Sequence, residues 1–311
     1  MLYPVHEGFI APARARPQIW RVVLGIVLAT LIYAIVALAV LAIAVYLRLP
    51  SDFMNDLNTW STDGRIGPNP LETELRGLLE GRTPTDVLVM LSTFGGMFLG
   101  AMAAARWLHG RSFVSLTGPL AVATRHFGIA ALATLLLSTL GLLIPPYLDA
   151  EVNLRLSVWL TFLPMALVMV LLQTGAEELL FRGYLQQQLA ARFRSPLVWM
   201  LLPSILFGLG HYNPAQFGDA AWLVVAVTTL VGIFAADLTA RTGTIGAAWG
   251  LHFANNVVAI LIISLEGPLS GLSLWWIPEV SIADRSLELA LVRDIAVLCA
   301  IWLVIRRILR P

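Results

Sequence analysis

Two adjacent glutamates and an arginine stand inside a long apolar stretch of this sequence. Residues 160–172, which precede them, have the composition of a helix that faces hydrocarbon. In a helix, Glu178 and Arg182 are four residues apart, so they lie on one face and can form an ion pair. Glu177 points about 100° away, and we expect it to have no partner in its own helix. The pattern predicts one glutamate held in an ion pair and one left free for chemistry.

Three further polar side chains lie in two later apolar segments. His211 ends the first of these segments. His252 and Asn256 are four residues apart in the second, so they share a helix face. Asn255 follows His252 by three residues and faces it less directly, which makes it a supporting candidate. Together with the glutamates, these side chains form a constellation that could serve one site.

The depth of these groups in the membrane can be compared by counting from the turns. Glu177 precedes the turn at Ser195 by about 18 residues and His211 follows it by about 16, which corresponds to roughly 27 and 24 Å of helix. An antiparallel pair of helices would therefore hold both at similar depth. His252 lies only about 10 residues beyond Thr242, so its helix must sit deeper or tilt to reach the same level. These residue counts therefore permit Glu177, His211 and His252 to belong to a single site.

Hydrolysis of a peptide bond would use groups of these types. It needs a base that takes a proton from water and donors that stabilise the developing oxyanion. A buried glutamate suits the first task, an imidazole can orient the water or protonate the leaving amine, and an asparagine amide can donate to the oxyanion. Glu177, His211 and His252 could instead bind Zn²⁺, although the His-Glu-x-x-His pattern of helical zinc proteases is absent. We favour water activated by Glu177 and keep the metal as a second mechanism.

The composition is that of a membrane protein. Of 311 residues, 58% are apolar and 13% are charged, against roughly 25% charged residues in ordinary globular proteins. Mean hydropathy is +0.81. A net charge of +1 gives no support for nucleic-acid binding. Cys299 is the single cysteine, which excludes an intrachain disulfide and does not favour a catalytic thiol.

The apolar segments predict an all-α, polytopic fold with about eight transmembrane helices. We place them at about residues 20–47, 86–106, 127–144, 156–193, 197–211, 220–238, 244–265 and 289–305. Gly96-x-x-x-Gly100 and Gly246-x-x-x-Gly250 predict faces where helices pack closely. We divide the chain into an N-terminal part (1–155), a four-helix catalytic core (156–265) and a C-terminal part (266–311).

The arginines predict the orientation in a bacterial cell membrane. When the chain is threaded through the expected spans, the ends that are rich in arginine all fall on one side of the membrane. They are residues 14–21, 106–125, 182–194, 241 and 306–310. Such ends are typically cytoplasmic, so we expect both termini in the cytoplasm. Residues 48–84 then form an outer loop, whose role the sequence leaves open.

The polar motifs resemble a known family. Glu177-Glu178-x-x-x-Arg182, Phe207-x-x-x-His211 and His252-x-x-x-Asn256 are similar to the three motifs of the CAAX protease and bacteriocin-processing family of intramembrane proteases, over roughly residues 160–262. The resemblance implies that Glu177 activates water with help from His211. It also implies that His252 and Asn256 stabilise the oxyanion, and that Glu178 and Arg182 hold the helices. Members are described both as metalloproteases and as glutamate proteases, so it leaves the metal open.

Two aromatic residues near the motifs, Phe181 and Phe207, are interpreted as packing residues that could also line a substrate groove. The resulting prediction is an intramembrane endopeptidase that acts on a membrane-associated substrate, such as a prenylated Cys-a-a-X protein or a bacteriocin-like peptide. One alternative is a non-catalytic scaffold or bacteriocin-immunity protein that uses the same cavity for binding. Another is a proton- or ion-coupled transporter, since buried glutamate and histidine also build proton relays; the sequence has no obvious inverted repeat to support it. The oligomeric state stays open.

Overall fold

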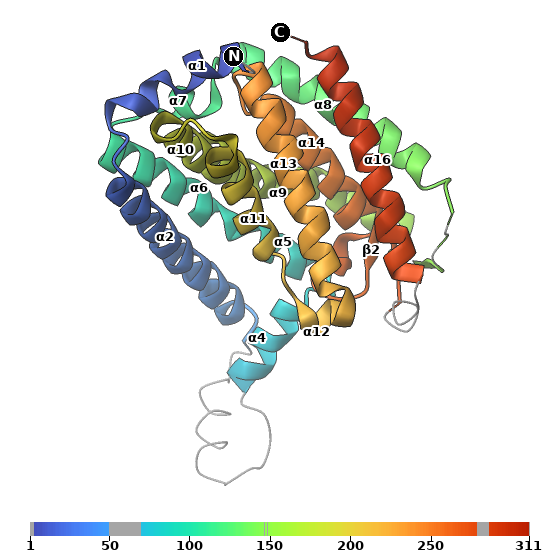
Figure 1. Cartoon of the computed structure of the whole chain (residues 1–311). Helices are drawn as coiled ribbons and strands as arrows, with labels where there is room; N and C mark the ends of the chain where they lie inside the picture. The colour runs from blue at the N-terminus through green and yellow to red at the C-terminus, as the bar shows by residue number, and fades with distance from the viewer. Residues whose placement is uncertain (1–2, 50–69, 146, 148, 279–285, 311) are drawn as a thin grey trace.

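The computed structural model describes residues 3–49, 70–145, 147, 149–278 and 286–310. The described chain is a bundle of helices with one small sheet (Figure 1). α1 (Pro4–Ile10) and the end of α16 (Ser286–Ile308) lie at the same end of the bundle, and α4 (Pro70–Glu80) lies at the opposite end. The all-α class is confirmed for the bulk of the chain.

Among the described residues, five helical stretches are long and apolar enough to cross a membrane. They are α2 (Ile19–Tyr46), α5–α6–η2 (Pro84–Leu108), α8 (Leu120–Gly141), α9–η3–α10 (Leu156–Arg192) and α12–η5–α13 (Pro214–Thr242). Two further apolar helices are shorter: η4–α11 (Leu197–Leu209) and α14–η6 (Gly246–Ile262). The chain is an integral, multi-pass membrane protein.

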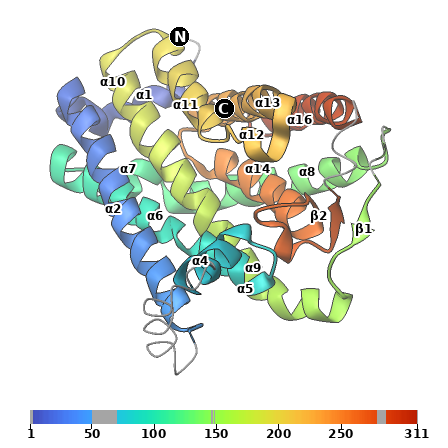
Figure 2. The same cartoon turned by 90° about the horizontal axis from the view of Figure 1, so that it is seen from below.

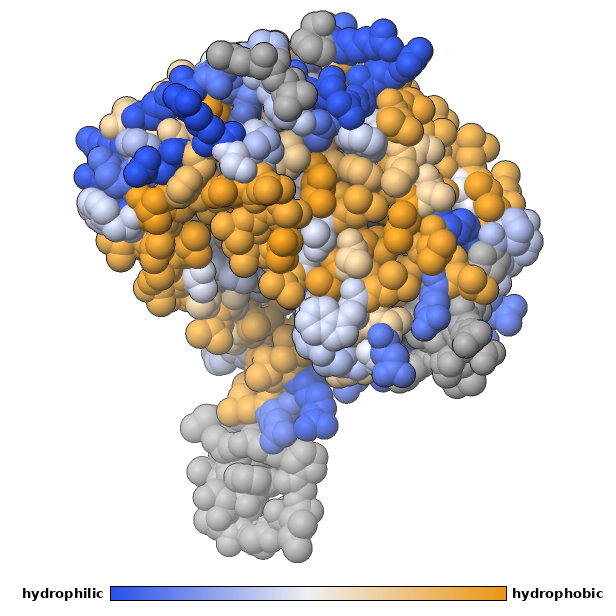
Figure 3. All heavy atoms as spheres, viewed as in Figure 1, coloured by the Kyte–Doolittle hydropathy of each residue, from blue (hydrophilic) through white to orange (hydrophobic). Residues whose placement is uncertain are grey.

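The expected number of eight spans is not confirmed. α16 occupies the segment of the last expected span. It carries Arg293 and Asp294 in its interior and is not among the five stretches that are apolar enough to cross a membrane. The two shorter helices have fewer residues than the roughly 20 that a straight crossing requires. On the face shown in Figure 3, apolar side chains nevertheless form a broad band between a polar end at α1 and a polar region at α4. The side of the membrane on which each end lies stays a prediction.

The small sheet was not expected. β1 (Glu151–Val152) pairs antiparallel with β3 (Trp275–Ile277), and β3 pairs parallel with β2 (Ile263–Leu265). β2 occupies the end of the segment 244–265 that we assigned to a continuous helix. The helix ends at Ile262, and the residues that follow it pair with β3. This pairing gives hydrogen bonds to backbone groups that a loop without water around it would leave unsatisfied.

Both glycine motifs lie where helix backbones touch. A Cβ on Gly100 would come within 2.6 Å of the carbonyl oxygen of Ala29 in α2. A Cβ on Gly246 would come within 2.0 Å of the carbonyl oxygen of Ala123 in α8, and one on Gly250 within 2.2 Å of that of Phe127. Only glycine permits these approaches, so the predicted contact faces are confirmed. α14 is thereby pressed against α8.

The short N-terminal helix α1 packs on the ends of α10 and α13. The Tyr3 hydroxyl donates to Asp237 Oδ1 at 2.8 Å, and burial together with this bond raises the pKa of Tyr3 to about 12. His6 is 4% exposed, stacks on Trp199 at 4.7 Å between ring centroids, and leaves Nε2 without a hydrogen bond. Burial lowers the pKa of His6 from 6.5 to about 4. α1 is therefore an integral part of the packed end of the bundle.

The remaining described elements are short connections. They are the π-helical turn η2 (Ala104–Leu108), α7 (Phe113–Thr117), α12 (Pro214–Phe217), and the 3-10 turns η1 (Ala11–Ala15), η5 (Gly218–Ala220) and η7 (Ser270–Leu272). The predicted turn at Thr242-Gly243 is confirmed, since Gly243 ends α13 (Ala221–Thr242) in the left-handed conformation with a φ of 64°. α5 (Pro84–Ser92) begins at a capping box between Thr83 and Asp86, and α6 (Phe94–Ala103) continues it.

Candidate active site

The two glutamates lie at the end of α9 (Leu156–Glu178), in the middle of the molecule. The helix continues as η3 (Leu179–Gln186), a π-helical stretch, and then as α10 (Gln187–Arg192). Seen from the end at α4, this long helix runs diagonally between α2 on one side and α14 on the other (Figure 2). We expected a regular helix here; the wider winding begins one residue after Glu178. Such π-helical turns occur frequently at functional sites.

Two contacts hold α9 against α14 (Gly246–Asn256) beside the glutamates. Trp249 Nε1 donates to Thr174 Oγ1 at 3.1 Å. Gly175 leaves room for the same indole, since a Cβ there would lie 2.6 Å from the ring. The carboxylates are thus presented to the face of α14 that carries His252.

Glu178 and Arg182 form a buried ion pair, as the spacing predicts. Arg182 Nη1 donates to Glu178 Oε1 at 2.9 Å, and the two side chains are 2% and 1% exposed. Arg182 Nη2 also donates to the carbonyl oxygen of Gly232 in α13 at 3.2 Å. The guanidinium therefore connects Glu178 of α9 to the backbone of α13.

His252 lies between the two glutamates. Its Nδ1 is 2.8 Å from Glu178 Oε1, and its Nε2 is 3.3 Å from Glu177 Oε2. Because Glu178 is paired with Arg182, its Oε1 accepts and His252 Nδ1 carries the hydrogen of that bond. His252 thus directs one ring nitrogen at each glutamate.

Our expectation that Glu177 has no partner in its own helix is wrong. Gln173, one turn earlier in α9, donates from Nε2 to Glu177 Oε2 at 2.7 Å. Gln173 Oε1 in turn accepts from Asn256 Nδ2 at 2.9 Å. The sequence contained a signal for Gln173, because it lies four residues before Glu177. We had used this spacing only to find pairs of opposite charge. A polar side chain four residues from a buried acid is a candidate partner for the same reason.

His211 is contributed by the turn after α11 (Leu202–Leu209). It is half-buried, its Nδ1 is 2.8 Å from the carbonyl oxygen of Phe207, and it is close enough to interact electrostatically with Glu177. The Phe207 ring contacts His211 at 4.9 Å and His252 at 5.5 Å between centroids. Arg182 lies 4.8 Å above the same ring, and Phe181 packs edge-on against it at 5.3 Å. Both phenylalanines are packing residues beside the polar groups, as interpreted from the sequence.

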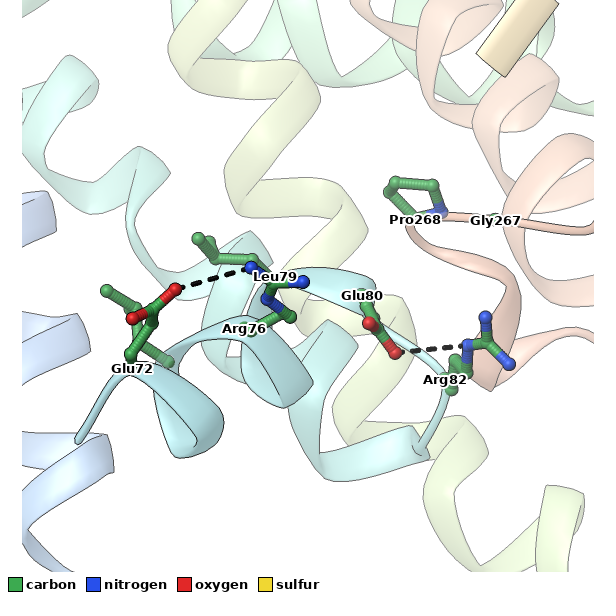
Figure 4. A pocket seen from close by; sticks show the side chains of 8 residues that line it. Glu72, Arg76, Leu79, Glu80, Arg82, Gly267 and Pro268 are labelled. Carbon is green, nitrogen blue, oxygen red and sulfur yellow. Dashed lines mark hydrogen bonds and ion pairs between the residues drawn. The ribbon is translucent and has the colours of Figure 1, made fainter. Parts of the chain in front are cut away.

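Asn255 touches this group through Asn256, since its Nδ2 donates to Asn256 Oδ1 at 3.4 Å. It lines a separate cavity of 420 Å³ between α8, α13, η6 (Val257–Ile262) and α16, whose wall also contains Arg293 and Asp294. A second hollow of 440 Å³ lies below it at α4, bordered by the ion pairs Glu72–Arg76 and Glu80–Arg82 (Figure 4). Glu177 lines neither of these two cavities.

The metal alternative is not supported by the geometry. Within the described part of the chain, no three His, Cys, Asp or Glu side chains are grouped so that they could hold a metal ion. His252, one of the three proposed ligands, directs both ring nitrogens at carboxylates. The same atoms that a zinc ion would need are used in hydrogen bonds.

Comparison with known proteins identifies the region that carries these side chains. Residues 159–258 match the model of the family described as type II CAAX prenyl endopeptidase Rce1-like. The uncharacterized protein YyaK of Bacillus subtilis (strain 168) is 35% identical over 126 residues, which are 40% of this chain and 41% of the relative. The chain therefore covers about two fifths of that relative's length. No solved structure matches the chain.

Proposed function

We propose that this chain, whose residues 159–258 form an Rce1-like CAAX prenyl endopeptidase domain, is an intramembrane endopeptidase. The observation that carries the proposal is the position of His252 between the two glutamates, one paired with Arg182 and one not. A scaffold would not need ionisable side chains in contact with one another inside a membrane helix bundle. Such groups are costly there and mark functional sites by default.

Glu177 is the proposed general base. Its side chain is 10% exposed and that of Glu178 is 1% exposed, so Glu177 is the glutamate that water can reach. Glu177 takes a proton from water while the water oxygen bonds to the carbonyl carbon of the peptide. When the tetrahedral intermediate collapses, the C–N bond breaks and that proton passes to the departing amine nitrogen. His211, from the turn after α11, is the proposed side chain that orients the water.

His252 and Asn256 are the proposed oxyanion donors. The negative charge that develops on the carbonyl oxygen needs fixed donors in a site from which bulk water is excluded. Glu178 holds Nδ1 of His252, so Nε2 is the nitrogen proposed to turn from Glu177 to the substrate oxygen. The amide of Asn256 lies one helical turn further along α14. Glu178 and Arg182 hold these donors by joining α9, α13 and α14 around the reaction centre.

The proposed substrate is a membrane peptide. The glutamates lie on α9, part of a helical stretch that is long and apolar enough to cross a membrane, so we expect the peptide to enter from the bilayer or from its interface. The family resemblance favours a substrate with a C-terminal Cys-a-a-X sequence on a prenylated cysteine. A bacteriocin-like peptide is the second class to be tested.

The experiment compares three proteins reconstituted in lipid nanodiscs with a farnesylated, fluorophore-labelled Cys-a-a-X peptide. The wild type is expected to release the three C-terminal residues. Glu177→Gln should cleave at least about 100-fold more slowly, because it lacks the general base. Glu72→Gln is the matched control: the same substitution, at a glutamate whose side chain is 60% exposed in α4, is expected to leave cleavage unchanged.

A comparison of C-terminal peptides from membranes that contain wild type or Glu177→Gln tests other membrane substrates. Cleavage by Glu177→Gln at the rate of the wild type would refute the proposal. A cellular phenotype that survives both Glu177→Gln and His252→Ala, with no cleavage product in either assay, would instead favour the non-catalytic scaffold or immunity role.

A further inference from the structure

We propose that Gln173 is the positioning residue of this site: it aims the Glu177 carboxylate and connects it to Asn256 across two helices. The inference rests on the proposed function and extends it to a residue outside the three motifs. Gln173 is 6% exposed and lies one helical turn before Glu177, on the same face of α9.

The donors and acceptors of the three side chains form a directed chain. An ionised carboxylate only accepts hydrogen bonds, so the group that faces Glu177 Oε2 at 2.7 Å must be the NH₂ of Gln173. The oxygen of that amide then faces Asn256, which must present its own NH₂ at 2.9 Å. The carboxylate form of Glu177, which its proposed role as general base requires, thus determines the orientation of both amides. Bonds that run head to tail in this way polarise and strengthen one another in a buried site.

This series of hydrogen bonds also gives the two oxygens of Glu177 separate tasks. Oε2 receives the NH₂ of Gln173 and faces Nε2 of His252. Among the described residues, no group forms a hydrogen bond to Oε1. With Oε2 anchored from two sides, the carboxylate cannot rotate freely, and Oε1 is left as the oxygen that accepts the proton of water.

Asn256 is held by the same contact. One hydrogen of its amide binds Gln173 Oε1, and its Oδ1 is 3.4 Å from Asn255 Nδ2. One amide hydrogen remains for a substrate oxygen. Gln173 therefore sets the geometry of the base on α9 and of an oxyanion donor on α14 at once. No residue of the three motifs joins Glu177 to Asn256 in this way.

The test uses the full-length protein in nanodiscs and the peptide assay described above. Gln173→Met keeps the length of the side chain and removes both hydrogen bonds. We expect kcat to fall by about 10- to 100-fold, since a small displacement of a catalytic group has an effect of this size, while KM changes less than about twofold. Gln186→Met is the matched control, because Gln186 is 1% exposed on the continuation of the same helix and binds the carbonyl oxygen of Ala236. It is expected to retain the wild-type kcat.

A double-mutant cycle separates positioning from packing. Gln173→Met and Asn256→Ala should each lower kcat, and the double variant should lose less than the product of the two losses, because the residues act as one unit. Gln173→Glu is a second variant. It keeps an oxygen for Asn256 but, when ionised, cannot donate to Glu177, so its kcat should fall as well.

A folded Gln173→Met protein with a kcat within about twofold of wild type would overturn the inference. So would equal losses of kcat in Gln173→Met and Gln186→Met, or losses of kcat that multiply in the double variant. Unfolding of both Gln173 variants, with Gln186→Met folded, would also overturn it by making Gln173 a residue of stability alone. The proposed function fails separately, if Glu177→Gln cleaves like the wild type. A wild-type rate in Gln173→Met beside an inactive Glu177→Gln removes only the positioning role.

Discussion

His252 Nδ1 lies 2.8 Å from Oε1 of Glu178, and this contact decides which ring nitrogen faces the other glutamate. Because Glu178 is paired with Arg182, it accepts the Nδ1 hydrogen and leaves Nε2 to face Glu177. The two neighbouring glutamates therefore have different tasks although they follow one another in the chain. Glu178 orients the imidazole through Nδ1, and Glu177 faces Nε2.

Glu178→Gln tests this division. The variant keeps the shape of the side chain but loses the charge that orients His252 and pairs with Arg182. We expect cleavage to fall by at least about 100-fold, as it does when an acid that orients a catalytic histidine becomes an amide. The rate is measured with the peptide assay, and thermal unfolding is measured on the same preparation. Wild-type cleavage by a folded Glu178→Gln protein would contradict the assigned orientation.

Arg182→Met tests the ion pair as a source of stability. The substitution leaves Glu178 as a buried charge without its guanidinium, which should destabilise the protein by about 3–5 kcal/mol. The combined variant Glu178→Gln with Arg182→Met removes both charges and should be less destabilised than Arg182→Met alone. Equilibrium unfolding of the purified proteins measures the difference. Equal stability of the two variants would show that the buried charge is compensated by other groups.

Gly250→Ala tests the contact between α14 and α8. The added methyl group would lie 2.2 Å from the carbonyl oxygen of Phe127, so α14 must shift away. We expect a loss of about 1–3 kcal/mol in the free energy of unfolding, together with reduced cleavage, because His252 moves with its helix. Gly128→Ala in α8 is the control, since nothing lies within 4 Å of the position that its methyl group would take. Its stability should equal or exceed that of the wild type.

His6 predicts a loss of stability in acid. Its pKa is about 4 in the folded protein and 6.5 when the residue is exposed, so the unfolded chain binds more protons between these values. Stability therefore falls as the pH falls from 6.5 towards 4, by up to about 3 kcal/mol. His6→Phe keeps the ring that packs on Trp199 and removes the titrating group. Melting temperatures recorded between pH 4 and pH 7.5 should fall less in His6→Phe than in the wild type; parallel curves would contradict the prediction.

Part of this site could be predicted because its determinants are local. The ion pair of Glu178 and Arg182 follows from their spacing of four residues, which keeps both side chains near one face of the helix although the winding widens at Leu179. The glycine faces at Gly96 and Gly246 also follow from spacing within one helix. The expected number of membrane spans did not follow in the same way. A hydropathy pattern does not show how two short helices and a helix with interior charges are accommodated in the bundle.

Other features depend on how helices rotate and cross. Asn255 and Asn256 are neighbours on α14, yet one lines a cavity near α16 and the other binds Gln173. The sequence ranked them only by their spacing from His252. The partner of Glu177 within its own helix was missed because it carries no charge. The strand at Ile263–Leu265 depends on pairing with a segment more than ten residues away, which hydropathy does not reveal.

The amino-acid sequence by itself determined that this is a helical membrane protein, and which polar residues it carries in its apolar segments. The cost of placing charged groups in hydrocarbon makes composition and spacing sufficient for that conclusion. Only the tertiary structure decided that His252 lies between Glu177 and Glu178 and that Gln173 connects Glu177 to Asn256. Those contacts join α9 to α14, and the rotation of one helix against another depends on side-chain packing along the whole interface, which no local pattern records.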